Sequence, residues 1–364
     1  MAPSVSLTKD EFRLLTWTHP QFSQMAIQPE SLQRHCPLDN GRLRPRTAQV
    51  SASPSTVGSL ECIPLEIIHM ILNLLDLQCL TDIRAVSWRA RALVDSVPKY
   101  NAIVTHCPDA LRALLSMRMA VHFTASDIFE ALCTQSCFGC GQFGPFLDMF
   151  TAQRCCFDCL AHSDSLLSMT ASSARKEFGL DLKTMRTIPT LLSIPGEYSE
   201  SERTYRRRTR LVRMLSASAA KSHYHDIGTL HRRPASPAMS SPHPPEPRLT
   251  RNSHRSLQKF DGYTQNPHRF MPMLRFPSLD RRTGKLDWGV SCQACHHGPR
   301  DERGGYCDWN TVYSTSGYIG HFQKCEVSRS VRAEIPQFID HDGDGRNQHD
   351  LDGQFMAFLN NFGL

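Results

Sequence analysis

Two pairs of cysteines place the tightest constraint on how this chain can fold. The first pair is Cys137-Phe-Gly-Cys140 and the second is Cys156-Phe-Asp-Cys159, with fifteen residues between the pairs. Two cysteines separated by two residues can hold one metal ion through a tight turn, and two such pairs at this separation are typical of a tetrahedral zinc site with four thiolate ligands. The spacing therefore predicts a small module built around one zinc ion at residues 137–159.

Other cysteines lie close to this motif and offer alternative ligands. Cys155 could take the place of Cys156, and Cys133 precedes Cys137 by one helical turn, but either choice breaks the two-residue spacing. We therefore interpret Cys133 and Cys155 as bystanders. For the whole group, the competing interpretation is a set of buried free thiols, which are common singly but not as two such pairs.

A second metal-binding pattern lies further along the chain. Cys292-Gln-Ala-Cys295 is followed after twenty-five residues by His321-Phe-Gln-Lys-Cys325, in which His321 and Cys325 would share one face of a helix. These residues predict a site with three thiolates and one imidazole. Because protein side chains fill all four positions at each site, we expect two structural zinc ions rather than catalytic ones. Competing ligands for the second site are Cys307, His296 and His297.

The chain shows no sign of export or of membrane insertion. Its sequence begins MAPSVSLTKD, without a basic region followed by an apolar one, and no stretch approaches the roughly 18 uninterrupted apolar residues of a membrane span. We therefore expect a protein of the cytoplasm and/or nucleus that has no membrane partner. In such a reducing compartment the 14 cysteines are kept as thiols, which favours metal binding over disulfides.

An unusually apolar helix is predicted to begin at Pro64. Its polar residues Glu66, His69 and Asn73 are spaced so that they share one narrow face. The rest of the cylinder is apolar, which is too wide a surface for one neighbouring helix. A segment of about 40 residues has little core of its own, so we expect this surface to be shared with the next helices and with a partner. The apolar positions are Leu65, Ile67, Ile68, Ile71, Leu72, Leu74 and Leu75.

The sequence at 60–100 resembles the F-box, a three-helix domain. The residues that carry the resemblance are Ile63, Pro64, Glu66, Ile67, Ile71, Leu72, Leu75, Leu80, Ile83, Arg84, Val86, Ser87, Trp88, Arg89 and Leu93. Ile63 stands where the usual motif has leucine. The resemblance implies that this segment binds the Skp-type adaptor of a cullin–RING ubiquitin ligase, while the rest of the chain recruits a target protein that the family does not specify. Residues 101–215 and 262–325 are also similar to a fungal type of F-box protein.

The resemblance further implies which side chains meet the adaptor. We assign this role to Pro64, Ile67, Ile68, Ile71, Leu72, Leu75 and Trp88. Ile68 and Leu72 lie four residues apart on one helical stripe and are expected to be the central anchors. If that stripe faces the core instead, Ile67 and Ile71 take their place. The competing interpretation is that these are the first core helices of an ordinary α domain.

The remaining segments complete a mainly α-helical fold with small zinc-stabilised α+β modules and long disordered stretches. The prolines and serines of 231–248 predict an extended linker. Phe270 to Phe276 and Lys285 to Ser291 flank the turn sequence Arg281-Arg282-Thr283-Gly284, which predicts a hairpin. We divide the chain into a disordered arm (1–58), the F-box (59–100), a helical region with the first zinc module (101–215), a Pro/Ser-rich linker (216–258), a second zinc module with a hairpin (259–326) and a flexible acidic tail (327–364).

Charge does not indicate a nucleic-acid partner. The 41 basic and 35 acidic side chains are largely interspersed, unlike those of a dedicated nucleic-acid binder. The basic stretch RTYRRRTRLVR at 203–213 could contact phosphate, but it fits an amphipathic helix with a solvated charged face better. Asp340 to Gly345 begins like a calcium loop, yet Leu351 stands where the loop needs glutamate, so we interpret it as part of the tail.

No catalytic pattern accompanies these motifs. The sequence has no Gly-x-Ser-x-Gly, no phosphate-binding Walker loop and no His-Glu-x-x-His, so we predict that the chain is not an enzyme. The alternative function is that of a zinc-dependent nucleic-acid-binding regulator. That alternative requires residues 203–213 to contact phosphate and assigns no function to the Pro64 helix.

Overall fold

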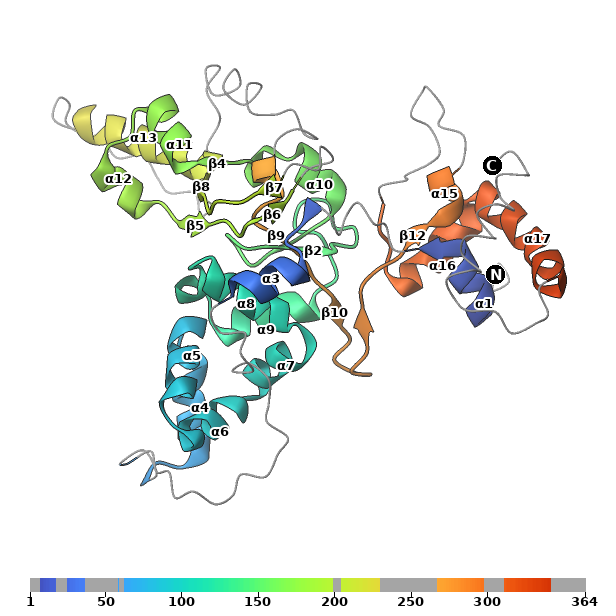
Figure 1. Ribbon diagram of the computed structural model, residues 1–364, viewed down its shortest axis with the longest axis horizontal. Coiled ribbons are helices and arrows are strands. Elements are labelled where there is room, and N and C mark those ends of the chain that lie inside the picture. Colours follow the sequence, from blue (N-terminus) through green and yellow to red (C-terminus); the bar gives the residue numbers. More distant parts are fainter. Residues whose placement is uncertain are drawn as a thin grey trace, which may run out of the picture.

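The structure of this protein is a computed structural model. It describes residues 7–17, 25–36, 58, 62–198, 204–229, 267–297 and 311–341. Helices dominate these residues, and the short strands form two- and three-stranded sheets, as the predicted mainly α fold with small α+β modules requires. Helices α1, α15, α16 and α17 gather at one end of the molecule in Figure 1, away from α4, α5 and α6.

The segment from Pro64 to Asp95 forms the predicted three helices. Pro64 caps the first helix, and the side chains of Asp76 and Ser87 cap the other two by accepting from backbone amides. The buried Arg84 guanidinium pairs with Asp95 at 2.6 Å and so fastens the second helix to the third. The helices are α4 (Leu65–Leu74), α5 (Leu77–Val86) and α6 (Trp88–Asp95).

Three further helices extend this array and share its hydrophobic core. Proline opens two of them, at Pro98 and Pro108, where its missing amide costs no hydrogen bond. Thr124 and Asp127 cap the third reciprocally, as their spacing in the sequence suggests. These elements are α7 (Pro98–His106), α8 (Pro108–Ser116), η2 (Ala120–His122) and α9 (Ala125–Cys133).

A three-stranded sheet joins the first cysteine motif to a segment more than a hundred residues later. Its order is β3-β2-β9, and all pairs are antiparallel. The buried Arg154 fixes this junction because its guanidinium donates to four backbone carbonyls, those of Ala131, Gly144, Phe276 and Pro277. The strands are β2 (Phe146–Asp148), β3 (Arg154–Cys155) and β9 (Met273–Arg275), and the short helices that follow β3 are α10 (Phe157–His162) and η3 (Asp164–Leu166).

A second antiparallel sheet, in the order β4-β8-β5, corrects our interpretation of the basic stretch at 203–213. We expected an amphipathic helix, but residues 210–213 are the central strand, because Leu211 and Val212 are both buried and Arg213 pairs with the buried Asp148. The elements here are β4 (Ser168–Thr170), α11 (Ala171–Phe178), α12 (Leu182–Thr187), β5 (Thr190–Leu192), β8 (Arg210–Arg213) and α13 (Met214–Thr229), with a separate pair of strands, β6 (Gly196–Glu197) and β7 (Thr204–Tyr205).

The N-terminal segment is folded where we predicted a disordered arm. Leu15 and Leu32 are fully buried, each in a different hydrophobic cluster. A reciprocal cap between Thr8 and Glu11 starts the first helix. Our prediction was wrong for these residues because their apolar runs are short and find their partners only at distant positions in the chain. The elements are α1 (Lys9–Leu15), β1 (Thr16–Trp17) and α3 (Pro29–His35).

The C-terminal part contains a hairpin and three helices. The hairpin turns through Gly284, whose φ of 69° suits glycine, but its strands are shorter than predicted, and 273–275 belongs to the sheet of β2 instead. A helix also occupies the beginning of the predicted flexible tail. No helix of the described residues has the length and apolar character of a membrane span. The elements are η5 (Pro267–Arg269), β10 (Ser278–Leu279), β11 (Leu286–Asp287), β12 (Ser291–Cys292), α15 (Gln293–His297), α16 (Thr315–Lys324) and α17 (Glu326–His341).

Candidate functional site

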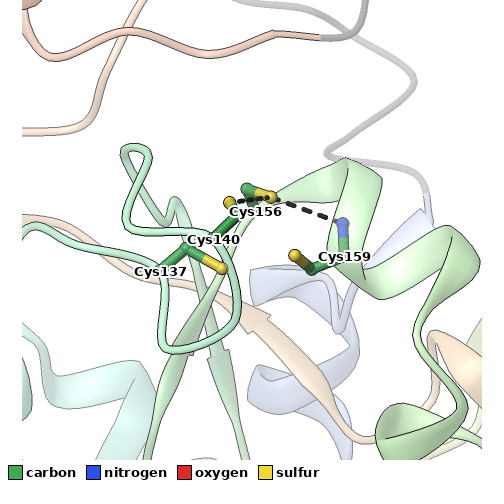
Figure 2. A group of neighbouring side chains, drawn as sticks. All are labelled: Cys137, Cys140, Cys156 and Cys159. Carbon is green, nitrogen blue, oxygen red and sulfur yellow. Dashed lines mark hydrogen bonds between the residues drawn. The ribbon is translucent and has the colours of Figure 1, made fainter.

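Four thiols converge at the first cysteine motif. The sulfur atoms of Cys137, Cys140, Cys156 and Cys159 all lie within 4.8 Å of one another, and Figure 2 shows them facing a common centre. The Sγ atoms of Cys140 and Cys156 are 3.5 Å apart. Tetrahedral zinc with bonds of about 2.3 Å to sulfur would hold its ligands about 3.8 Å apart, so the observed spacing fits that ion. We call these four residues the first cluster.

The backbone around the first cluster explains why the ligands meet. Cys156 caps α10, so the amide of Cys159 donates to its sulfur at 3.4 Å. On the other side, a Cβ at Gly139 would stand 3.0 Å from the sulfur of Cys159, and Gly141 has a φ of 77° that side chains disfavour. Gly139 is therefore favoured by the approach of the loop to α10, and Gly141 by its backbone conformation.

The electrostatics of the first cluster call for a cation. Hydrogen bonding from the Cys156 thiol, together with that from backbone amides, lowers the pKa of Cys137 to about 4. The same contact raises the pKa of the Cys156 thiol, because two adjacent thiolates repel each other. A bound zinc ion would supply the positive charge that lets all four sulfur atoms remain deprotonated.

The neighbouring cysteines lie outside the converging group. Cys155 is fully buried, its sulfur lies 3.8 Å from that of Met273, and burial raises its pKa well above the ordinary value. Cys133 lies outside the group of converging thiols. The structure therefore groups the four cysteines of the two-residue pairs and leaves the bystanders apart.

The second motif forms a cluster of mixed ligands. Cys292, Cys295, His321 and Cys325 bring their ligand atoms within 4.8 Å of one another, and we call them the second cluster. The sulfur of Cys295 lies 3.5 Å from Nε2 of His321 and 3.6 Å from the sulfur of Cys325. Burial by itself lowers the pKa of His321, but its contacts with the Cys292 and Cys325 thiolates outweigh that effect and raise it to about 9. The competing ligand Cys307 and the side chains of His296 and His297 lie outside the described residues.

Aromatic side chains orient the second cluster. The ring of Tyr313 stacks on that of His321 with 4.5 Å between the ring centroids. The hydroxyl of Tyr318 lies 4.0 Å from the sulfur of Cys292 and donates to the backbone carbonyl of Leu15 at 3.0 Å. Through Tyr318, a ligand of the second cluster is connected to the N-terminal helix. Sequence reasoning missed this connection because no local pattern marks it.

The third candidate site is the apolar surface of α4. Leu65, Ile67, Met70, Ile71 and Leu74 are exposed, and Leu74 exposes 81% of its area. Val86 and Trp88 extend the exposed set from the junction of α5 and α6. We call these seven residues the exposed apolar face.

For two residues the predicted contact with the adaptor is wrong. Ile68 and Leu72 are 8% and 6% exposed and belong to the main hydrophobic core, so they cannot be the central anchors. The stripe that contains Ile67 and Ile71 points outward instead. A helix that is apolar around most of its circumference gives no sequence signal for which stripe faces inward. Of the remaining predicted contacts, Pro64 and Trp88 are exposed and Leu75 is partly buried.

Comparison with known families addresses the α4 segment. Residues 60–102 match the family model of the F-box domain, which covers α4, α5 and α6 and thus the exposed apolar face. A comparison with curated proteins gave no match, and neither did one with solved structures. The likeness of the remaining residues to fungal F-box proteins stays a prediction. The chain therefore contains an F-box domain, which supports a role as an adaptor-binding component of a ubiquitin ligase.

Proposed function

We propose that this chain is a substrate-receptor subunit of a cullin–RING ubiquitin ligase. Its F-box binds the Skp-type adaptor through the exposed apolar face, and the region around the two clusters recruits a protein target. The chain carries out no catalysis itself but brings the target to the ligase. The observation that supports this proposal most strongly is the position of the exposed apolar face inside the segment that matches the F-box.

Physical reasons favour a permanent partner on this face. Seven large apolar side chains exposed on α4, α5 and α6 exceed what a water-facing surface normally carries. The ion pair between Arg84 and Asp95 and the shared core hold α4, α5 and α6 in position, so the face does not need to rearrange before it binds. Recognition of this kind places most of its free energy in a few central apolar contacts.

Each cluster would hold one zinc ion in a structural role. Protein side chains supply all four ligand positions, so no position remains for water or a substrate. Bound zinc would supply the charge that holds three or four thiolates at one point. With zinc bound, the ligand side chains of the first cluster would keep β2, β3 and α10 together, and those of the second would keep α15 and α16 together.

The alternative of a nucleic-acid-binding regulator loses part of its support, although Arg206, Arg207 and Arg210 are exposed. Arg208 donates to the backbone carbonyls of His35 and Ser116, and Arg213 is buried beside Asp148. These two arginines of the basic stretch stabilise the fold, so they are not available to contact phosphate.

A pair of double variants tests adaptor binding. In Ile67→Ala with Ile71→Ala, we expect binding to the adaptor to weaken by more than about 2 kcal/mol, with the unfolding temperature and zinc content unchanged. A matched surface variant, Leu182→Ala, removes an exposed leucine of α12 and should bind normally. Co-precipitation with the adaptor, circular dichroism and elemental analysis supply the three measurements.

The second double variant is a control for the loss of core packing. Ile68→Ala with Leu72→Ala removes buried side chains and should destabilise the F-box by several kcal/mol, about 2–5 for each residue. If the Ile67/Ile71 variant stays folded and binds the adaptor as tightly as the unchanged chain, the proposal is wrong.

A further inference from the structure

A groove lies between α9 and the first cluster, on a part of the molecule that the F-box does not use. Its volume is about 680 Å³, in the range of sites that hold ligands. One wall is the face of α9 that carries Ser126 and Glu130, and the other is formed by Phe138 and residues 151–154. The groove is therefore bounded on one side by the loop that the first zinc ion would hold.

The apolar surface of the groove is held rigidly. Phe123, Ala131 and Ala152 are buried along it, and Phe138 is 45% exposed at its edge. Phe138 lies between two cysteines of the first cluster, and its amide donates to the carbonyl of Arg154 at 2.9 Å, so its backbone is held at the edge of the groove. A backbone held in this way reduces the conformational entropy that is lost when Phe138 contacts a partner.

The charged groups along the groove are predominantly acidic. Asp127 and Glu130 lie at its edge, and Glu130 exposes 61% of its side chain. The one described cation that lines the groove, Arg154, is buried and already donates to backbone carbonyls. Arg281 reaches Glu130 at 2.7 Å, but both side chains are mostly exposed, and pairs of that kind contribute only about 0–1 kcal/mol. A cation of a partner can therefore compete for Glu130.

We infer that this groove binds a segment of the target protein in which an aromatic or aliphatic side chain stands next to lysine or arginine. The apolar side chain packs on Phe138 and the wall of α9, and the basic side chain pairs with Glu130 and Asp127. This inference rests on the proposed function, since it names the class of target that the receptor recognises. The same negative charge disfavours a nucleic acid in the groove.

The test uses the full zinc-loaded chain and a displayed library of random short peptides. Selected peptides should carry an apolar residue beside a basic one. For a synthesised peptide from the selection, measured by fluorescence anisotropy, we expect Phe138→Ala to weaken binding by more than about tenfold and Glu130→Gln by about threefold. Leu182→Ala and Glu30→Gln, which change exposed residues away from the groove, are the matched controls and should leave binding unchanged.

Several results would overturn the inference. These are a selection without basic residues, a peptide that binds Phe138→Ala as tightly as the unchanged chain, and a peptide displaced by an oligonucleotide. If Phe138→Ala loses zinc, Glu130→Lys is the deciding variant, because it reverses an exposed charge on a helix. Loss of peptide binding with zinc retained would support the groove. Retained peptide binding would refute it.

Adaptor binding, measured on the same proteins, separates this inference from the proposed function. Variants of the groove should bind the Skp-type adaptor normally, because the groove and the exposed apolar face share no residue. If the unchanged chain binds the selected peptides but not the adaptor, the proposed function fails and the groove stands. If it binds the adaptor but selects no peptide, the groove fails and the proposed function stands.

Discussion

The two clusters have similar ligands on very different supports. The first takes all four side chains from residues 137–159, next to β2, β3 and α10, and β9 is the distant strand of the same sheet. The second takes its ligands from residues 292–325 but is completed by α1 and β1, and the hydroxyl of Tyr318 bonds to a carbonyl 303 residues away. The spacing of the cysteines and histidine thus indicates which side chains converge, but not which segments support them.

The two clusters also differ in which other parts of the fold share their hydrophobic surroundings. Cys137 and Cys156 belong to the largest hydrophobic cluster, which contains Ile68 and Leu72 of the F-box as well. The hydrophobic cluster around Cys292 and Cys295 contains no described residue of the F-box. Loss of the first metal ion should therefore affect the F-box, whereas loss of the second should not.

The strongest test of this difference removes one ligand from each cluster. Cys140→Ser and Cys325→Ser should each lower the zinc content by one ion. The local folding free energy lost with the ion is on the order of 10 kcal/mol in small zinc modules. We expect Cys140→Ser to lower the unfolding temperature of the part that contains the F-box and to weaken adaptor binding, while Cys325→Ser leaves adaptor binding intact.

Equal effects of the two substitutions on adaptor binding would show that the two supports are not independent. Elemental analysis gives the ion count, and co-precipitation gives adaptor binding. Cys155→Ser serves as a control, because that buried thiol is no ligand and its loss should leave the zinc content unchanged.

A second comparison concerns the ion pair near each cluster. Arg213 and Asp148 are both buried, so Arg213→Met would leave the Asp148 carboxylate unpaired and cost about 3–5 kcal/mol. Glu11 and Arg332 pair at 2.6 Å beside the second cluster but remain partly exposed, so Glu11→Gln should cost less than about 1 kcal/mol. Urea unfolding measures both values, and a larger loss for Glu11→Gln than for Arg213→Met would contradict the burial that we describe.

A third comparison uses a buried leucine from each support. Leu15 and Leu147 are fully buried, and replacing either by alanine should cost about 2–5 kcal/mol. We expect Leu15→Ala to accelerate zinc release to a chelator from the second cluster only, and Leu147→Ala to accelerate it from the first only. Release of the same ion in both variants would show that α1 does not support the second cluster.

The smallest effect concerns the turns between paired cysteines. Gly139→Ala would bring a methyl group to 3.0 Å from the sulfur of Cys159, so we expect a loss of about 1–2 kcal/mol and weaker zinc retention. The second cluster has Ala294 at the matching position, within a helix, so Ala294→Gly should cost only about 0.5–1 kcal/mol and keep its zinc. Competition with a chromophoric chelator measures both, and undiminished zinc affinity in Gly139→Ala would contradict the tight approach of the loop to α10.

These contrasts also explain how much could be predicted from the sequence. The ligand sets and the three helices of the F-box follow from local spacing, since each depends on residues a few positions apart. Leu15 gave no such signal because its partners, Tyr318 and the strand of Cys292, lie at the far end of the chain. The strand at 210–213 was missed because the buried partner of Arg213 is Asp148, which no local pattern connects with it.

The prediction of which stripe of α4 faces the core was wrong for a different reason. Both the stripe of Ile68 and Leu72 and the stripe of Ile67 and Ile71 are apolar, so the pattern allows either to face the core. Only packing in three dimensions decides between them, and it places the first pair in the main hydrophobic core. An ambiguous pattern of this kind is expected where a helix has a core on one side and a partner on the other.

The pairing of β1 with β12 has a consequence for synthesis of the chain on the ribosome. Residues 7–17 are made long before β12 and the helices that cover Leu14 and Leu15. Until then these two leucines stay open to solvent and to chaperones, while the F-box, whose contacts lie within a continuous stretch, can already fold. A nascent chain that stops before α16 would thus carry a finished F-box and an uncovered apolar N-terminal segment, which cellular quality control can recognise.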